Sequence, residues 1–224
     1  MIRHKIRKSW IKVFKKKNWG EYPAEDLVRF IKKLKKKLLK KRIKVLEIGC
    51  GAGGNLWFFG KEKIYFDAID ISNIALAKVN KIFQNKYKKY KNYKKNIISC
   101  DVLNMPESLQ NYDAIIDSES LCYLSIKEFK DIENEIYKKL KKGGFFWSRI
   151  FSNETSGSNS GKKVSKNFRI PSFGPLKGYG PTRILKIKDV KKIYSKYWKS
   201  IEVTELIRKN NKDIVHELIV EAKK

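Results

Sequence analysis

Features that would place this chain in a membrane or in an oxidising compartment are scarce in its 224 residues. There is no run of 18 or more apolar residues, and basic residues interrupt the first twenty positions, where a signal peptide needs an apolar stretch. The three cysteines, Cys50, Cys100 and Cys122, are far apart and lack the close pairs that zinc sites use. We therefore expect no transmembrane segment, no disulfide framework and no metal site, and a reducing, cytoplasmic environment.

Acidic residues and arginine are also few. The chain has 52 Lys and Arg against 23 Asp and Glu, a formal net charge of +29, and only 8 of the basic residues are Arg. Sites that read phosphates or bases specifically favour arginine, because its planar guanidinium binds with two donors at once. Two interpretations stay open: the lysine excess reflects the codon bias of an A/T-rich genome, which we favour, or it attracts a polyanionic partner such as nucleic acid.

The chain does contain 42% hydrophobic residues, enough for one sizeable core in a single domain spanning 1–224. Apolar residues three and four apart predict a helix from about Pro23 to Leu38, within an N-terminal helical extension at 1–41. Short β-rich strands then alternate with helical stretches, which predicts an α/β fold with an open, doubly wound, mostly parallel, Rossmann-like sheet. The expected strands are 43–48, 64–70, 96–100, 112–117 and 144–151; the expected helices start near 53, follow Ser72 and span 125–141, the last with a capping box of Ser125 and Glu128.

The alternation of strands and helices stops after residue 151. Residues 152–182 are rich in Gly, Ser and Pro without clear periodicity, so we interpret them either as a lid over a substrate or as a disordered loop. Residues 183–224 predict a helix over 190–198 and two strands, 201–207 and 214–222. These strands bring the expected sheet to seven, with an antiparallel hairpin at the C-terminal end.

The string VLEIGCGAGGN, residues 45–55, joins the first expected strand to a glycine-rich turn. Glycines there let the chain turn sharply and bring backbone amides against a ligand at a helix N-terminus. The string fits both the GxGxxG pattern of dinucleotide sites and a GxGxG pattern, and Asp70, which ends the second strand, suits an adenosine ribose in either. Glu47 favours a cationic ligand, because its carboxylate would repel the pyrophosphate of NAD. S-adenosylmethionine, with a sulfonium and an α-amino group, fits better.

Five motifs extend this pattern: VLEIGCGAGGN, FDAIDIS, CDVLNMP, YDAIIDSESLCYL and LKKGGFFWSRIF. In order and spacing they resemble the motifs of the class I S-adenosylmethionine-dependent methyltransferases. The resemblance covers residues 43–151, the expected cofactor-binding core, and continues loosely to the end of the chain. In front of it, NWGEYPAEDLVRFI resembles the leading helix of the family's small-molecule branch.

For individual residues, the resemblance implies a cofactor site along the carboxyl ends of the strands. The methionine half is then lined by Glu47, Gly49, Gly51 and Gly53, the ribose is bound by Asp70, the adenine is flanked by Ile71 and held at its edge by Asp101 and Val102, and the transferring methyl group is faced by Asp117. Asp101 and Asp117 have an alternative role as caps of a helix or turn.

Methyl transfer from a sulfonium is an in-line displacement with a good leaving group. Positioning and the exclusion of water therefore supply much of the rate, and no catalytic base is obligatory. Five residues near the expected mouth of the site are candidates for a catalytic role, although each has an ordinary structural role as its alternative: Glu119, Tyr123, Tyr179, Arg183 and His216.

Two absences narrow the class of acceptor. Family members that methylate exocyclic amines of bases carry an Asn-Pro-Pro-Tyr-like tetrapeptide after the fourth strand, where this chain has DSES, and cytosine C5 enzymes need a Pro-Cys pair, which it lacks. We therefore expect a small-molecule acceptor, such as a sugar or a cell-surface precursor. RNA methylation through the basic surface, and cofactor binding without catalysis, are the alternatives.

The first 17 residues raise a separate alternative. Ile2, Ile6, Trp10, Val13 and Phe14 form an apolar stripe on one face of a basic helix. Such a helix either lies on an anionic membrane or packs on its own domain. We favour packing, since apolar stripes of this kind usually face the core of their own protein.

Overall fold

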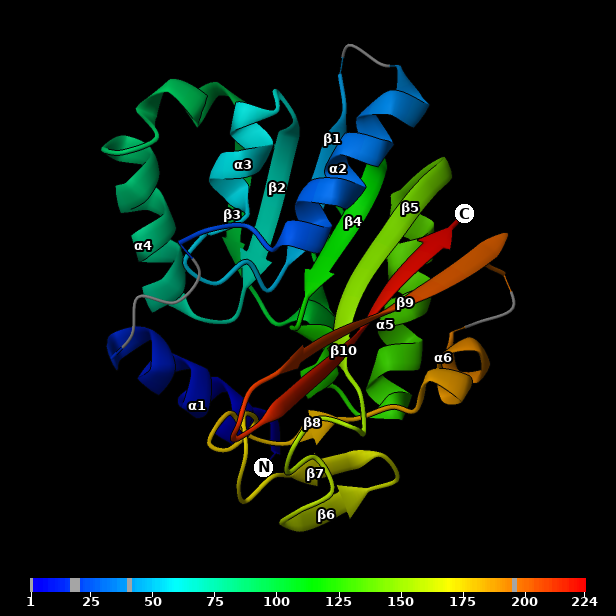
Figure 1. The fold of residues 1–224 in the computed structure, drawn as a ribbon. Coiled ribbons are helices and arrows are strands. Elements are labelled where there is room, and N and C mark those ends of the chain that lie inside the picture. Colours follow the sequence, from blue (N-terminus) through cyan, green and yellow to red (C-terminus); the bar gives the residue numbers. More distant parts are fainter. Residues whose placement is uncertain (1, 17–20, 40–41, 195–196) are drawn as a thin grey trace.

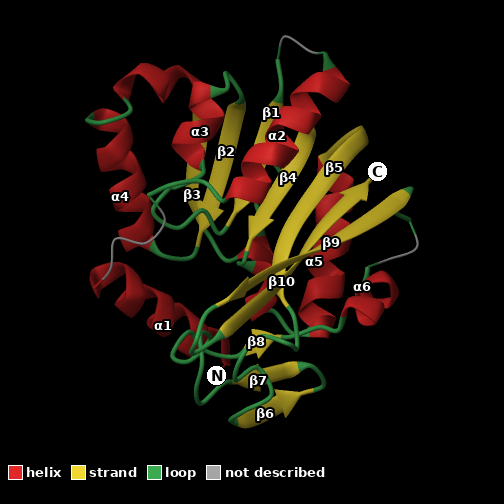
Figure 2. Cartoon of the chain, viewed as in Figure 1, coloured by secondary structure: helices red, strands yellow, loops and turns green. Residues whose placement is uncertain are grey.

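The computed structural model describes residues 2–16, 21–39, 42–194 and 197–224, and its centre is a seven-stranded sheet (Figures 1 and 2). The strand order is β3-β2-β1-β4-β5-β10-β9. The first five of these strands are parallel, whereas β10 is antiparallel to both β5 and β9. The predicted α/β fold and its antiparallel C-terminal hairpin are confirmed. The strands are β1 (Lys44–Ile48), β2 (Tyr65–Asp70), β3 (Lys94–Ser99), β4 (Tyr112–Ser118), β5 (Leu140–Phe151), β9 (Ser200–Lys209) and β10 (Ile214–Lys223).

Helices cover both faces of this sheet. Along β1, Val45 belongs to the buried cluster that contains residues of α2, α3 and α4, whereas Leu46 and Ile48 belong to the cluster that contains residues of α5 and α6, because successive strand residues point to opposite faces. The capping box expected before α5 is present, with Ser125 Oγ accepting from Glu128 N at 3.3 Å and Glu128 Oε2 from Ser125 N at 2.8 Å. The helices are α1 (Ile2–Lys16), α2 (Glu25–Leu38), α3 (Leu56–Lys61), α4 (Asn73–Gln84), α5 (Ile126–Lys139) and α6 (Ile187–Ile193), with short 3₁₀ helices η1 (Lys88–Tyr93), η2 (Val102–Asn104) and η3 (Leu121–Tyr123).

Residues 152–182 differ from the aperiodic loop that the sequence suggests. They contain β6 (Lys162–Ser165) and β7 (Phe168–Ile170), which form a small antiparallel sheet with β8 (Thr182–Arg183). Strands of two to four residues are too short to show the alternation from which strands are predicted. Figure 1 shows this second sheet at the same end of the molecule as α1.

The observed ends of the other helices and strands differ by a few residues from those expected from the sequence. The helix expected from about residue 53 begins at Leu56, and β5 begins at Leu140, directly after α5. The helix expected over 190–198 is α6, which begins at Ile187 and ends at Ile193, and the expectation for residues 195–196 lies outside the described residues.

Helix α1 lies across the carboxyl ends of the strands (Figure 1). Ile6 and Phe14 are buried, and the ring of Trp10 lies 5.2 Å from that of Tyr123 and 5.8 Å from that of Tyr179. Ile6, Trp10 and Phe14 of the apolar stripe therefore pack on their own domain. Among the described residues, no helix combines the length and the apolar character needed to cross a bilayer.

Candidate functional site

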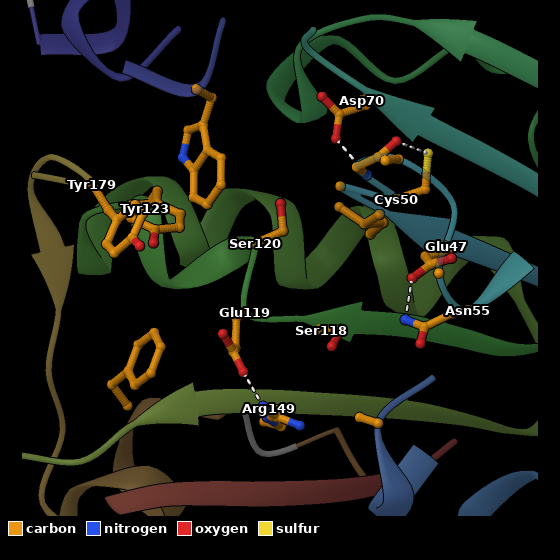
Figure 3. Close-up of a pocket in the computed structure, with 18 of the residues that line it drawn as sticks. Glu47, Cys50, Asn55, Asp70, Ser118, Glu119, Ser120, Tyr123, Arg149 and Tyr179 are labelled. Atoms are coloured by element: carbon orange, nitrogen blue, oxygen red, sulfur yellow. Dashed lines mark hydrogen bonds and ion pairs between the residues drawn. The ribbon is translucent and has the colours of Figure 1, made fainter. Parts of the chain in front are cut away.

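A cavity of about 700 Å³ opens at the carboxyl ends of β1, β2 and β4 (Figure 3). Its lining combines the glycine turn after β1, the residues that follow β2 and β4, one face of α1, and part of the β9–β10 hairpin. The sheet reverses its strand order between β1 and β4, and such switch points are where open α/β sheets bind ligands.

The glycine turn needs glycine at its first two positions. Gly49 has φ +70°, and a Cβ there would lie 2.0 Å from Ser120 Oγ; Gly51 has φ +53°, and a Cβ there would lie 3.1 Å from the ring of Phe14. Both glycines line the cavity, so backbone rather than side chain faces its interior. Gly53, the third predicted glycine, packs against α4 and is not part of the lining.

Glu47 is a buried carboxylate in the cavity wall. Its Oε1 accepts a hydrogen bond from Asn55 Nδ2 at 2.6 Å, and its Oε2 has no hydrogen-bond partner among the described residues. Burial, with a contribution from the charges of Asp70 and Asp117, raises the pKa of Glu47 to about 8. A buried oxygen of this kind is a site for a cationic or hydrogen-bond-donating group of a ligand.

Asp70 connects the glycine turn to the end of β2. Its Oδ2 accepts from Gly51 N and its Oδ1 from Ser72 N, both at 2.8 Å. Burial raises the pKa of this carboxyl above its usual range. Asp70 lines the cavity and also fixes the shape of the turn, and its contact with a ribose stays a prediction.

The residues expected around an adenine lie together at one end of the cavity. Ile71, Asp101 and Val102 all line it. Asp101 also caps η2, because its Oδ1 accepts from Leu103 N at 3.1 Å, and it forms an ion pair with Arg3 of α1. The capping alternative for Asp101 is therefore observed, and α1 is tied to this end of the cavity.

Asp117 does not line the cavity, in contrast to the expectation that it faces the transferring methyl group. It is buried, its Oδ1 accepts from the backbone N–H groups of Ser120 and Leu121 at 2.8 Å, and its Oδ2 accepts from Ser148 Oγ at 2.6 Å. These bonds hold the turn that carries Ser120 against Gly49. Asp117 thus has the turn-capping role, and it supports the cavity wall from behind.

Three of the five catalytic candidates line the cavity. Glu119 follows β4 and forms an ion pair with Arg149, while Tyr123 and Tyr179 surround the Trp10 ring (Figure 3). Glu119 has φ +63°, a backbone conformation that is uncommon for a residue with a side chain. Glu119 and Tyr123 reach the cavity from the connection between β4 and α5, and Tyr179 reaches it from the loop between β7 and β8.

The other two candidates, Arg183 and His216, are buried away from the cavity lining. Arg183 Nη1 donates to the Leu124 carbonyl at 2.9 Å, and its guanidinium lies 4.2 Å from the centre of the Phe129 ring. His216 Nδ1 lies 3.1 Å from a carboxylate oxygen of Glu154. Their contacts support the structural alternative for both residues.

Sequence reasoning missed a charged network on the cavity wall. Arg149 of β5 pairs with Glu119 and, through Nε, with Glu217 Oε1 at 2.9 Å; Arg208 of β9 donates to Glu217 Oε2 at 2.6 Å. Glu217 lies on β10, and burial together with the nearby Glu119 carboxylate raises its pKa to about 7. The sequence shows charged residues on each of these strands, but it does not show which of them become neighbours when the strands pair.

Comparisons with known proteins agree with this geometry. Residues 45–144 match the family model described as a methyltransferase domain. This region is a class I S-adenosylmethionine-dependent methyltransferase domain. O-methyltransferase 3 of Dictyostelium discoideum is 29% identical to the chain over 158 residues, 65% of this chain and 35% of that protein. Sterol 24-C-methyltransferase of Candida albicans is 31% identical over 110 residues, 48% of this chain and 28% of that protein.

Solved structures share the fold of the methyltransferase domain at low sequence identity. The 1,6-didemethyltoxoflavin-N1-methyltransferase of Burkholderia thailandensis, solved with S-adenosylhomocysteine, has a TM-score of 0.70 at 14% identity over 99% of this chain and 88% of that one. The glycopeptide N-methyltransferase MtfA, in complex with S-adenosylmethionine, has a TM-score of 0.60 at 14% identity over 85% of this chain and 91% of that one. The chain spans about a third of the length of the curated relatives it matches.

Proposed function

We propose that the protein transfers a methyl group from S-adenosylmethionine to a small-molecule acceptor. The observation that carries this proposal is the buried carboxyl group of Glu47, a residue of the cavity lining beside the backbone of the glycine turn, whose Oε2 has no hydrogen-bond partner among the described residues. A cationic cofactor without phosphates fits this pair of features, because the carboxylate attracts its positive charge and the glycines admit its main chain.

Within this proposal, the described residues bind and orient the cofactor. Glu47 and the backbone of Gly49 and Gly51 would hold the methionine half, Asp70 the ribose, and the surfaces of Ile71 and Val102 the adenine. The bound cofactor supplies an activated methyl group on a sulfonium. Helix α1 and the residues around Tyr179 exclude water from the cavity, which strengthens the electrostatic interactions inside it.

The charged network on the opposite wall supports a role in proton removal. Glu217 is held by Arg149 and Arg208, and its pKa near 7 lets it accept a proton from an acceptor O–H or N–H group at neutral pH. The apolar surface around it, from Trp10, Phe151 and Leu176, suits an acceptor with an apolar body. A sugar or a cell-surface precursor is our preferred class, and the three free cysteines support activity in a reducing compartment such as the cytoplasm.

The first test is calorimetric titration of the purified protein with S-adenosylmethionine, S-adenosylhomocysteine and NAD. Binding of the first two but not NAD is expected, whereas binding of NAD alone would overturn the proposal. A panel of phenols, amines and sugar nucleotides is then incubated with S-adenosyl-[methyl-³H]methionine, and label in a small-molecule product is expected. Tight cofactor binding without transfer to any acceptor of the panel, or to RNA, would favour a non-catalytic binding protein.

A further inference from the structure

Residues 71–100 contain no Asp or Glu, although acids make up 23 of the 224 residues of the chain. The stretch holds eight lysines: Lys78, Lys81, Lys86, Lys88, Lys89, Lys91, Lys94 and Lys95. Six of these lysines fall within residues 86–95, where the positive charge of the stretch is therefore densest.

Aromatic rings alternate with the lysines of residues 86–95, which run through η1 at the β3 edge of the sheet. The rings of Trp57 and Tyr87 are stacked at 5.2 Å, and those of Tyr87 and Tyr90 at 6.3 Å. At the other end, Tyr22 lies edge-on to Trp57 at 6.4 Å, is 71% exposed and reaches the cavity lining. We call Tyr22, Trp57, Tyr87 and Tyr90 the aromatic ladder.

The ladder is fixed in place and surrounded by positive charge. A Cβ on Gly60 of α3 would lie 2.5 Å from Tyr90 Cβ, so Tyr90 can pack this closely against α3 only because residue 60 is glycine. Lys86 Nζ lies 5.3 Å from the centre of the Tyr87 ring, and Lys89 Nζ lies 5.1 Å from that of Tyr90. Cations over these rings show that the half-buried aromatics keep part of their π surface outside the core.

We propose that the aromatic ladder and the lysines of residues 86–95 form a binding surface for single-stranded nucleic acid. Stacked rings provide platforms for unpaired bases of any sequence, and adjacent lysines provide charges for the phosphates between them. A duplex would present its phosphates but not its base faces. An anionic membrane would attract the lysines, but Tyr87 and Tyr90 pack on the core and are not free to insert. Trp57, Tyr87, Tyr90 and the lysines lie outside the cavity lining, which only Tyr22 of the ladder reaches, so binding to them does not depend on which acceptor is methylated.

The lysines are tested by fluorescence anisotropy with a labelled oligouridylate of about 15 nucleotides, long enough for a site of this kind. Variant K86Q/K88Q/K89Q/K91Q removes four positive charges next to the aromatic ladder. The matched variant K186Q/K188Q/K191Q/K192Q removes four exposed charges at α6, on the other side of the sheet (Figure 1). The first is expected to weaken binding at least tenfold and to reduce the salt slope by about 0.7 for each phosphate that is no longer neutralised. Equal losses in both variants would show attraction by net charge alone and would overturn the proposal.

The rings are tested with Y87A/Y90A against Y87F/Y90F, which keeps both stacking surfaces. Alanine is expected to weaken oligouridylate binding roughly tenfold or more, and phenylalanine to leave it unchanged. Unchanged binding in a folded alanine variant would make the rings structural and overturn the proposal. The proposal would also be overturned if the variants lost binding to vesicles that contain phosphatidylserine but kept their binding to oligouridylate. All variants are expected to keep their affinity for S-adenosylhomocysteine, which separates failure at this surface from failure of the proposed function.

Discussion

Asn55 Nδ2 donates to Glu47 Oε1 at 2.6 Å across the glycine turn, and in the part of the chain that the structure describes, the second oxygen of this carboxylate has no hydrogen-bond partner. Asn55 follows the glycines directly and Glu47 is the last residue but one of the strand before them, so the turn itself brings the pair together. One oxygen is held by Asn55, and the other is buried in the cavity wall with no hydrogen-bond partner among the described residues. This division makes Glu47 the residue in which stability and ligand binding are expected to conflict.

The first prediction is that Glu47→Gln stabilises the ligand-free protein at high pH. The folded pKa near 8 lies above the value of about 4.3 for an unfolded Glu. The folded state therefore holds a proton that the unfolded state releases, and this stability is present at pH 4 and lost as the pH rises through 8. Urea unfolding is expected to show a gain of up to about 5 kcal/mol for the variant at pH 8.5 and little difference at pH 4.5. A constant difference between the two pH values would mean that Glu47 is already ionised when folded.

The second prediction is that S-adenosylmethionine binding at pH 7 releases a proton. A cation beside Glu47 favours the ionised carboxylate and lowers its pKa. Calorimetry in two buffers of different ionisation enthalpy measures the release, which is expected to vanish in Glu47→Gln together with a tenfold to hundredfold loss of affinity, roughly 1.5 to 3 kcal/mol. S-adenosylhomocysteine lacks the sulfonium but keeps the α-amino group, so the same release with this ligand assigns the contact to the amine. No release with either ligand would place Glu47 outside the cofactor site.

The third prediction concerns the glycine turn. Gly51→Ala adds a Cβ 3.1 Å from the Phe14 ring and forces a left-handed conformation on a residue with a side chain, at a cost of roughly 1 to 2 kcal/mol. Gly143→Ala is the matched control, because Gly143 has φ +75° and open space around its Cβ position. Both variants are expected to lose stability, but only the first to lose affinity for S-adenosylhomocysteine. Equal affinities would show that the ligand does not approach the turn.

The fourth prediction concerns Glu217. In a transfer assay with an acceptor identified from the panel, Glu217→Gln is expected to lower kcat at least tenfold while affinity for S-adenosylhomocysteine stays unchanged. The wild-type rate is expected to rise with pH through a pKa near 7, because the carboxylate accepts a proton only when ionised. Arg208→Gln removes one of its two partners and is expected to shift this pKa upward. A wild-type profile that is flat between pH 6 and 8 would exclude Glu217 as the base.

The fifth prediction tests the supporting role of Asp117. Ser148→Ala removes one hydrogen bond to the buried carboxylate and is expected to destabilise the protein by about 1 to 3 kcal/mol in urea unfolding. Affinity for S-adenosylhomocysteine is expected to change less than about threefold, because neither side chain lines the cavity. A large loss of affinity with unchanged stability would return Asp117 to the role that the family resemblance implies.

The parallel sheet and the glycine turn that lines the cavity are predictable from the sequence alone. Val45, Leu46 and Ile48 alternate between two covered faces, and Glu47 and the glycines adjoin them in the chain, so periodicity and spacing are enough to predict them. Local caps such as Ser125 with Glu128 are readable for the same reason, since both partners lie within one turn of helix.

The charged network on the cavity wall, in contrast, depends on the tertiary structure. Arg149, Arg208 and Glu217 come from three strands, and their ion pairs exist because the antiparallel hairpin places β10 between β5 and β9. The same packing separated the candidates, with Tyr123 and Tyr179 around Trp10 at the cavity and Arg183 and His216 buried elsewhere. A sequence records which side chains each strand carries, but contacts between distant segments depend on how the sheet is paired, and that pairing is fixed by burial summed over the whole domain.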